Sequence, residues 1–238
     1  MSPRPYPGPP ETPNADPRRI RAVLKRLQAY FGGGAFAPPR RVDPLEELVL
    51  TVLSQHTSDR NAERAFAELR AAHPTWEEVV AMPAPALADV IRSGGLANQK
   101  APRIQEILRE IRQREGSFTL ASLSERTDAG ARSYLMSLPG VGPKTAAVVL
   151  SFALGRDALP VDTHVHRVTR RLGIIPPKAS AERADAFLHE LVPDGLRTPL
   201  HVAFIRLGRE ICKAPVPRCR VCPLQDLCPS APRYLMEV

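Results

Sequence analysis

Two residues near the middle of the chain have side chains that could carry out covalent chemistry together. Lys144 follows Gly142 and Pro143, and proline favours the first position of a helix, so the lysine is expected in a first helical turn. The positive end of a helix dipole favours the neutral amine, which can form a Schiff base. Eighteen residues later, Asp162 could move a proton or stabilise a cation. Each also has an ordinary explanation, because such lysines are usually solvated and such aspartates often cap helices.

The residues around Lys144 predict two helices joined by a tight turn. Apolar residues over 134–138 have helical spacing, and the proline that follows them ends this helix. Gly140 and Gly142 flank Val141, so the backbone can turn sharply and approach another molecule without an intervening side chain. An apolar run over 146–154 then predicts the second helix.

Two segments closely resemble the endonuclease III-type DNA glycosylases. LPGVGPKTA, residues 138–146, matches the family's helix-hairpin-helix pattern L-P-G-V-G-x-K-T-A, and PVDTHVHRV, residues 160–168, contains V-D-T-H-V-x-R. The resemblance places the family's lysine nucleophile on Lys144 and its catalytic aspartate on Asp162. It extends from about residue 45 to Cys228.

The same resemblance implies that the hairpin binds a DNA phosphate. The backbone around Gly140, Val141 and Gly142 would make this contact through its amides. Pro143 departs from the family, because many members have an arginine at this position. The change removes one charge that would face a phosphate, but it leaves the nucleophile in place.

Two further segments resemble the parts of the family that enter the duplex. LSQHTSDRNA, residues 53–62, follows a predicted core helix, and its Gln55 matches the glutamine that fills the place of the departed base. GGLANQKA, residues 94–101, matches the G-L-x-N-x-K-A loop, so Leu96 is the expected wedge in the base stack and Asn98 a further DNA contact. The alternatives are an ordinary helix end at Gln55 and a leucine that folds back into the core.

The chain has four cysteines, and all of them lie near its C-terminus. They are Cys212, Cys219, Cys222 and Cys228, with the spacing C-x6-C-x2-C-x5-C. Disulfides suit secreted proteins, and nothing here indicates secretion. Zinc sites usually have two close cysteine pairs, whereas only one is present, so the spacing favours an iron–sulfur cluster and leaves zinc open.

The cysteine spacing also matches the cluster loop of the endonuclease III family in full. Gly208 and Arg209 precede it as they do in the family. The resemblance therefore implies a [4Fe–4S] cluster held by the four cysteines. Its expected task is structural, to shape a loop on which Lys213, Arg218 and Arg220 meet DNA phosphates.

Composition agrees with a nucleic-acid partner. The chain has 238 residues, a net charge of +8 and a pI near 9.8, which favour a polyanionic ligand. It has no apolar run of about eighteen residues and no secretory signal, so we expect no membrane association and a cytoplasmic protein on the nucleoid. Residues 1–17 contain seven prolines and predict a disordered tail.

Hydrophobic spacing predicts helices, and no segment alternates with a period of two, so the fold class is all-α. The predicted helical segments are 17–31, 45–53, a helix from 59, 76–82, 86–91, 104–111, 184–191 and 202–211. We expect two helical lobes with a DNA groove between them. One lobe is a continuous helical domain over 36–157 that contains the hairpin, and the other is a discontinuous cluster domain formed by 18–35 and 158–238.

The resemblance implies base excision by a monomer on double-stranded DNA that contains damaged bases or abasic sites. Lys144 would release a damaged, oxidised pyrimidine through a Schiff base, and β-elimination would cleave the strand on the 3′ side. A monofunctional glycosylase for mispaired adenine, thymine or uracil is an alternative, although such relatives usually lack the lysine. The adenine type also carries a further C-terminal domain, for which the residues after Cys228 leave no room.

Two other interpretations remain. Helix-hairpin-helix units often only bind phosphates, so the chain could be a non-catalytic DNA-binding module, although the presence of both Lys144 and Asp162 argues against it. The other interpretation is an enzyme of the same family with weak or narrow activity. Pro143 and the Gln55-His56 pair favour it mildly.

Overall fold

The computed structural model describes residues 16–32 and 42–236. The described residues form helices and no strand, which confirms the all-α prediction. The chain divides into two compact units. One is Pro39–Arg156, and the other joins Met1–Pro38 to Asp157–Val238. None of the helices in the described ranges has the length and hydropathy that a membrane crossing requires.

The predicted tail over 1–17 lies, as far as residue 15, outside the described residues. Of its last two residues, Asp16 caps the first helix and Pro17 begins it. Pro17 is the first residue of α1, and the Asp16 carboxylate accepts a hydrogen bond from the Arg18 amide at 2.8 Å. Proline and an acidic cap are both favoured at a helix start, which explains why these two residues are ordered as the start of α1.

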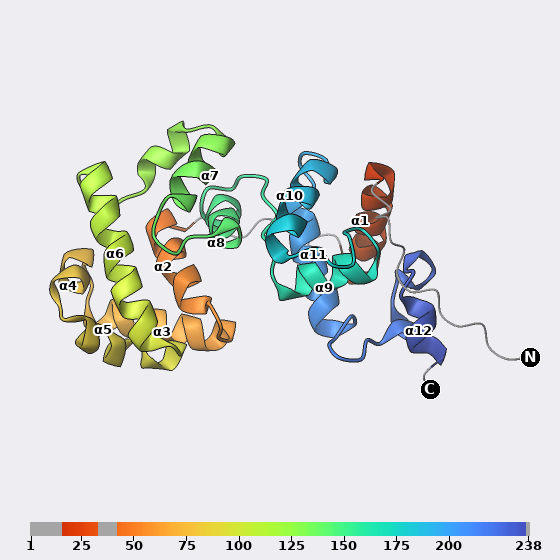
Figure 1. The fold of residues 1–238 in the computed structure, drawn as a ribbon, viewed down its shortest axis with the longest axis horizontal. Coiled ribbons are helices and arrows are strands. Elements are labelled where there is room, and N and C mark those ends of the chain that lie inside the picture. The colour runs from red at the N-terminus through yellow and green to blue at the C-terminus, as the bar shows by residue number, and fades with distance from the viewer. Residues whose placement is uncertain (1–15, 33–41, 237–238) are drawn as a thin grey trace, which may run out of the picture. The chain divides into compact units, whose positions relative to one another are not determined.

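The continuous unit is organised around its first helix. Its elements are α2 (Pro44–Ser54), α3 (Asp59–Ala72), α4 (Trp76–Ala81), α5 (Ala84–Val90), η2 (Arg92–Gly94), α6 (Ala97–Glu115), η3 (Ala121–Glu125), α7 (Asp128–Met136), α8 (Pro143–Val148) and the π-helical segment η4 (Val149–Ala153). α2 contacts α3, α6 and α8, and Figure 1 shows it in orange among them. Its apolar face is buried, as its spacing predicts.

The discontinuous unit is built around α11. Its elements are α1 (Pro17–Phe31), α9 (Thr163–Arg171), α10 (Ala181–Leu191), α11 (Arg197–Glu210), η5 (Cys219–Val221), η6 (Gln225–Leu227) and α12 (Ala231–Met236). α11 contacts both α9 and α1 (Figure 1), and the fully buried Phe204 belongs to this unit's core. A Cβ on Gly208 would lie 2.9 Å from the Cβ of His164, so the glycine lets α11 approach α9 closely.

Several helices begin earlier than the sequence predicts, among them α6 at Ala97 and α10 at Ala181, and in α5 and α11 the added first turn contains a proline. α5 begins at Ala84 rather than at residue 86, with Pro85 in its first turn. α11 begins at Arg197 rather than at residue 202, with Pro199 in its first turn. A proline in a first turn costs no intrahelical hydrogen bond, because the amides there have no partner in the helix.

Candidate active site

Lys144 is the second residue of α8, and its side chain is exposed. Gly142 precedes the helix in an extended conformation, and Pro143 occupies its first position. The next residues of the helix, including Ala146 and Ala147, are completely buried, and α8 packs on α2. The helix is thus anchored through its apolar residues and presents an amine at its open end.

The hairpin before Lys144 closes through its own backbone. Gly140 has φ +69°, a left-handed conformation that glycine adopts without strain. The Val141 amide donates to the Leu138 carbonyl at 3.2 Å, and the Val141 side chain is only 5% exposed. Nothing lies within 4 Å of the position that a Cβ on Gly142 would take. The Val141 amide is therefore used inside the turn, and the backbone at Gly142 is the open part of the hairpin.

An arginine from α6 lies against this hairpin. A Cβ on Gly140 would be 2.9 Å from both Cδ and Nη1 of Arg103. The Arg103 side chain is 45% exposed, and its ion pair with Glu106 is long, at 3.8 Å. Helical spacing places Arg103 on the outer face of α6 but cannot connect it to the hairpin, so sequence reasoning missed this cation.

Asp162 caps α9 in the other unit. Its Oδ1 accepts a hydrogen bond from the Val165 amide at 2.7 Å. No hydrogen bond to its Oδ2 is found among the described residues. Asp162 is therefore a helix cap, as its ordinary explanation predicts. The cap uses only Oδ1 and does not involve Oδ2.

The segment before Asp162 is fixed to α11 by hydrogen bonds. The Asp157 carboxylate accepts from the amides of Gly195 and Thr198, at 2.6 and 3.1 Å. Nδ1 of the buried His201 lies 2.8 Å from the Pro160 carbonyl. The segment therefore enters α9 from a fixed position. Lys144 belongs to the continuous unit and Asp162 to the discontinuous one.

The two predicted duplex-entering residues lie in the same unit, on neighbouring loops. Gln55 follows α2 and is partly exposed. Leu96 has φ 50° and is 47% exposed, so it does not fold back into the core. Asn98 is exposed in the first turn of α6. A Cβ on Gly95 would lie 4.0 Å from Oγ1 of Thr57, which places the two loops side by side.

A buried lysine that the sequence reasoning missed lies beneath these loops. Lys100 is 4% exposed, and its Nζ donates to the carbonyls of Leu53 at 2.6 Å and Gly94 at 2.8 Å. Burial lowers the pKa of Lys100 below its usual value. A signal was present in the sequence, because Lys100 is four residues before the buried Ile104 and so lies on the core face of α6.

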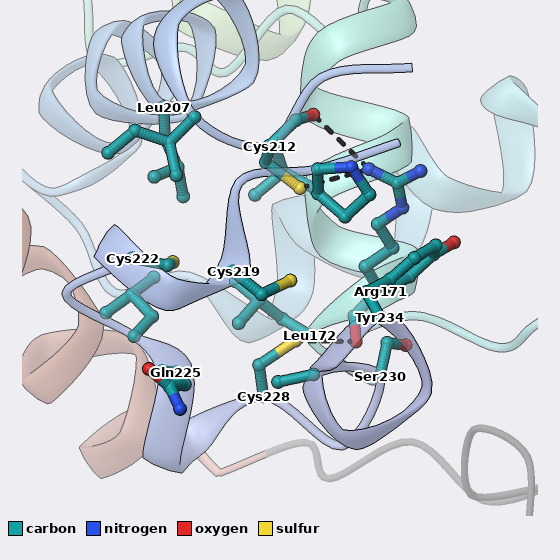
Figure 2. Close-up of a pocket in the computed structure, with 15 residues that line it drawn as sticks. Arg171, Leu172, Leu207, Cys212, Cys219, Cys222, Gln225, Cys228, Ser230 and Tyr234 are labelled. Carbon is teal, nitrogen blue, oxygen red and sulfur yellow. Dashed lines mark hydrogen bonds between the residues drawn. The ribbon is translucent and has the colours of Figure 1, made fainter. Parts of the chain in front are cut away.

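The four cysteines line one pocket in the discontinuous unit (Figure 2), together with Arg171 and Tyr234. None of them forms a disulfide. In the described ranges, no group of three or more His, Cys, Asp or Glu side chains could hold a metal ion. Burial raises the pKa of Cys219, Cys222 and Cys228 to about 11 in each case, which favours the protonated thiols at neutral pH.

Arginines from the helices fix the cysteine loop. Arg171 donates to the Cys212 Sγ at 3.4 Å and to the Lys213 carbonyl at 2.7 Å, and its guanidinium lies 5.0 Å from the Tyr234 ring centre. Arg19 of α1 donates to the Leu227 carbonyl at 2.8 Å. The predicted phosphate-binding side chains are exposed on this loop. They are Lys213, Arg218 and Arg220.

Comparison with known proteins agrees with these features. The chain is 38% identical over 189 residues to endonuclease III of Thermotoga maritima, which covers 79% of this chain and 84% of the relative. A solved structure of a trapped endonuclease III–DNA covalent intermediate matches with a TM-score of 0.79 at 32% identity, over 92% of this chain and 98% of that one. A thermostable thymine-DNA glycosylase shares the fold, with a TM-score of 0.75 at 21% identity.

The match to a protein family covers both of the segments that contain Lys144 and Asp162. Residues 49–194 correspond to the HhH-GPD superfamily of base excision DNA repair proteins. Endonuclease III of Bacillus subtilis is 37% identical over 186 residues, which is 78% of this chain and 81% of the relative. On both grounds the chain belongs to the HhH-GPD superfamily and, within it, to the endonuclease III family.

Proposed function

We propose that this protein is a base excision repair DNA glycosylase with AP lyase activity, which removes oxidised pyrimidines from double-stranded DNA and acts as a monomer. Membership of the endonuclease III family supports the activity. The single observation that carries the chemistry is the exposed Lys144 at the open end of a helix-hairpin-helix turn. An amine in that position can reach a nucleotide that has left the duplex.

Lys144 acts as the nucleophile. Its neutral amine attacks C1′ of the flipped nucleotide, the N-glycosidic bond breaks, and the base departs with the bonding electrons and takes up a proton. Loss of the amine proton and opening of the sugar ring give a Schiff base. Removal of a C2′ proton then breaks the bond to the 3′ phosphate by β-elimination, and hydrolysis of the imine releases Lys144.

Asp162 assists through the carboxylate oxygen that does not cap α9. A carboxylate can accept the proton of the attacking amine, or stabilise the positive charge that develops on the sugar as the base leaves. Capping fixes the other oxygen and therefore the orientation of the whole group. The cap thus serves the chemistry because it removes rotational freedom from the side chain.

Three parts of the chain bind the DNA around this chemistry. The open backbone at Gly142 contacts a phosphate, and the neighbouring Arg103 supplies charge beside it. Leu96 enters the base stack, where an apolar wedge compensates part of the cost of unstacking. Gln55 fills the place of the departed base with a side chain that can donate and accept hydrogen bonds.

We further propose that the four cysteines hold a [4Fe–4S] cluster rather than zinc. The cysteines line one pocket, yet the described residues offer no group of three ligands for one ion. A cluster is bound through one thiolate on each iron, so its four ligands need not converge on a point. The four cysteines would hold the cluster as thiolates, and the bound cluster would order the loop that carries Lys213, Arg218 and Arg220.

Borohydride trapping tests the proposed reaction. The wild-type protein is incubated with a duplex that contains thymine glycol or an abasic site, and reduction should yield a stable protein–DNA adduct. Lys144→Gln keeps a polar side chain of similar length and should abolish both the adduct and strand cleavage while DNA binding persists. Base release without an adduct would instead identify a monofunctional glycosylase, and binding without either would identify a DNA-binding module.

A further inference from the structure

The buried Lys100 has no role in the proposed reaction, yet it occupies a costly position. A buried ammonium group loses its hydration and is tolerated only where other groups satisfy it. Here two backbone carbonyls receive its hydrogen bonds, at 2.6 and 2.8 Å. A leucine or methionine would fill the same space on the core face of α6 without this cost. The presence of a lysine therefore indicates that the two carbonyls need a donor.

The two carbonyls occupy equivalent places in the two duplex-entering loops. Leu53 is in the last turn of α2, where carbonyl groups have no partner within the helix. Gly94 is the last residue of η2. Each carbonyl is two residues before the side chain that is proposed to enter the DNA, Gln55 in one loop and Leu96 in the other. One ammonium group thus binds both loops, in each case two residues before the side chain that is proposed to enter the DNA.

Both loops contain backbone that is unfavourable unless its surroundings fix it. His56 has φ 54° and Leu96 has φ 50°, and they are the non-glycine residues with positive φ in the described parts of the chain. Such conformations persist when neighbouring contacts determine them, and they cluster at functional sites. η2 has little freedom to adjust, because a Cβ on Gly94 would lie 3.1 Å from the Cβ of Ala65.

We propose that Lys100 is a positioning residue that joins the two loops, so that Gln55 and Leu96 enter the duplex as one preformed unit. This inference rests on the proposed function. The ammonium group ties the end of α2 to the end of η2, and the ordering of both loops is then complete before DNA binds. Binding a duplex with ordered loops avoids the entropy cost of ordering them in the complex.

The chain offers a matched control on the same helix. Gln105 is 3% exposed, and its Nε2 donates to the carbonyls of Val79 at 2.9 Å and Met82 at 2.8 Å. Lys100→Met and Gln105→Met each remove two hydrogen bonds to backbone carbonyls and leave an unbranched apolar side chain. Only the Lys100 acceptors belong to the loops that carry Gln55 and Leu96, so a difference between the variants reports on loop positioning rather than on stability.

The test uses the purified holoprotein at a temperature well below the melting point of each variant. Single-turnover β-elimination is measured on an abasic site in duplex and in single-stranded DNA, and 2-aminopurine beside the site reports unstacking by its fluorescence. Lys100→Met should lower the duplex rate by about 10²-fold, the loss expected when reacting groups shift by about 1 Å. It should reduce the fluorescence rise and leave the single-stranded rate unchanged, whereas Gln105→Met should change neither.

The second part of the test measures whether the effects of Lys100→Met and Leu96→Ala on the duplex rate are additive. Leu96→Ala should lower the duplex rate in the wild type and in Gln105→Met, but it should add little in Lys100→Met, because the wedge is already misplaced. Equal losses in Lys100→Met and Gln105→Met on both substrates would overturn the proposal, as would a full additional effect of Leu96→Ala. Lys100→Leu, which also removes both hydrogen bonds, replaces Lys100→Met if that variant does not fold, and the same outcomes decide. A wild type without any borohydride adduct would refute the proposed function instead.

Discussion

Substitution of Asp162 separates its observed role as a helix cap from the catalytic role that we propose for it. Its Oδ1 caps α9 through the Val165 amide at 2.7 Å, and Oδ2 is the oxygen that we propose takes part in the reaction. Asp162→Asn keeps an oxygen for the cap, and asparagine caps helices as well as aspartate does, so the free energy of unfolding should change by only about a few tenths of a kcal/mol. Asp162→Ala removes the cap and should lower it by about 1 kcal/mol. Base release should fall by about 10²–10⁴-fold in both variants, because both lose the charged oxygen.

The assay pairs single-turnover base release with thermal unfolding of the same samples. Ser180→Ala is the matched control, because the Ser180 Oγ caps α10 of the same unit through the Arg183 amide at 3.3 Å and has no part in the proposed reaction. It should lower stability much as Asp162→Ala does and leave base release unchanged. If Asp162→Asn released the base at the wild-type rate, or if its loss of activity followed its loss of stability, Asp162 would be only a cap.

Three further outcomes are expected. Arg103→Ala should weaken duplex binding and lower the slope of log K against log salt by about one unit, whereas Arg109→Ala, whose side chain bonds to the Val80 carbonyl, should leave the slope unchanged. Cys219→Ser should lose the broad absorption near 400 nm (about the position expected for iron–sulfur charge transfer) and bound iron by metal analysis, while zinc in colourless wild-type protein would contradict the cluster. Glu68 accepts a hydrogen bond from Ser93 Oγ at 2.7 Å, and this bond, together with Arg64, holds the pKa of Glu68 below its usual 4.5. The stability that Glu68 contributes is therefore present above pH 4.5 and is lost as the pH falls through its folded pKa. The difference in melting temperature between wild type and Glu68→Gln should therefore shrink from about pH 6 to about pH 3.

The sequence predicts the helices well where burial has a clear period. Over 17–31 and 45–53 the apolar residues repeat every three or four positions, and the structure buries them as predicted. The starts of α5 and α11 could not be placed, because a proline ends a helix in its interior but is tolerated in a first turn. The choice between these two positions depends on tertiary packing, which spacing does not contain.

The site is less predictable than the fold, because its parts come from distant segments. The turn before Lys144 and the cap at Asp162 are local features, and local sequence predicts both. The contact of Arg103 with Gly140 joins residues far apart in the chain, and periodicity says only that Arg103 points outward. Lys100 breaks the apolar face of α6, which signals an unusual residue but not which carbonyls it serves.

The discontinuous unit has a consequence for how the chain folds during synthesis. α1 leaves the ribosome before its packing partners, because its apolar residues are buried against the second half of the chain, and Arg19 donates a hydrogen bond to the Leu172 carbonyl 153 residues later. Pro39–Arg156 can meanwhile bury its own core, since its helices pack on one another. Contacts of such long sequence separation form slowly. Until they form, the apolar face of α1 is exposed and can bind chaperones or other chains. Nascent protein that stalls before α11 should therefore expose the apolar face of α1 while its continuous unit is already folded.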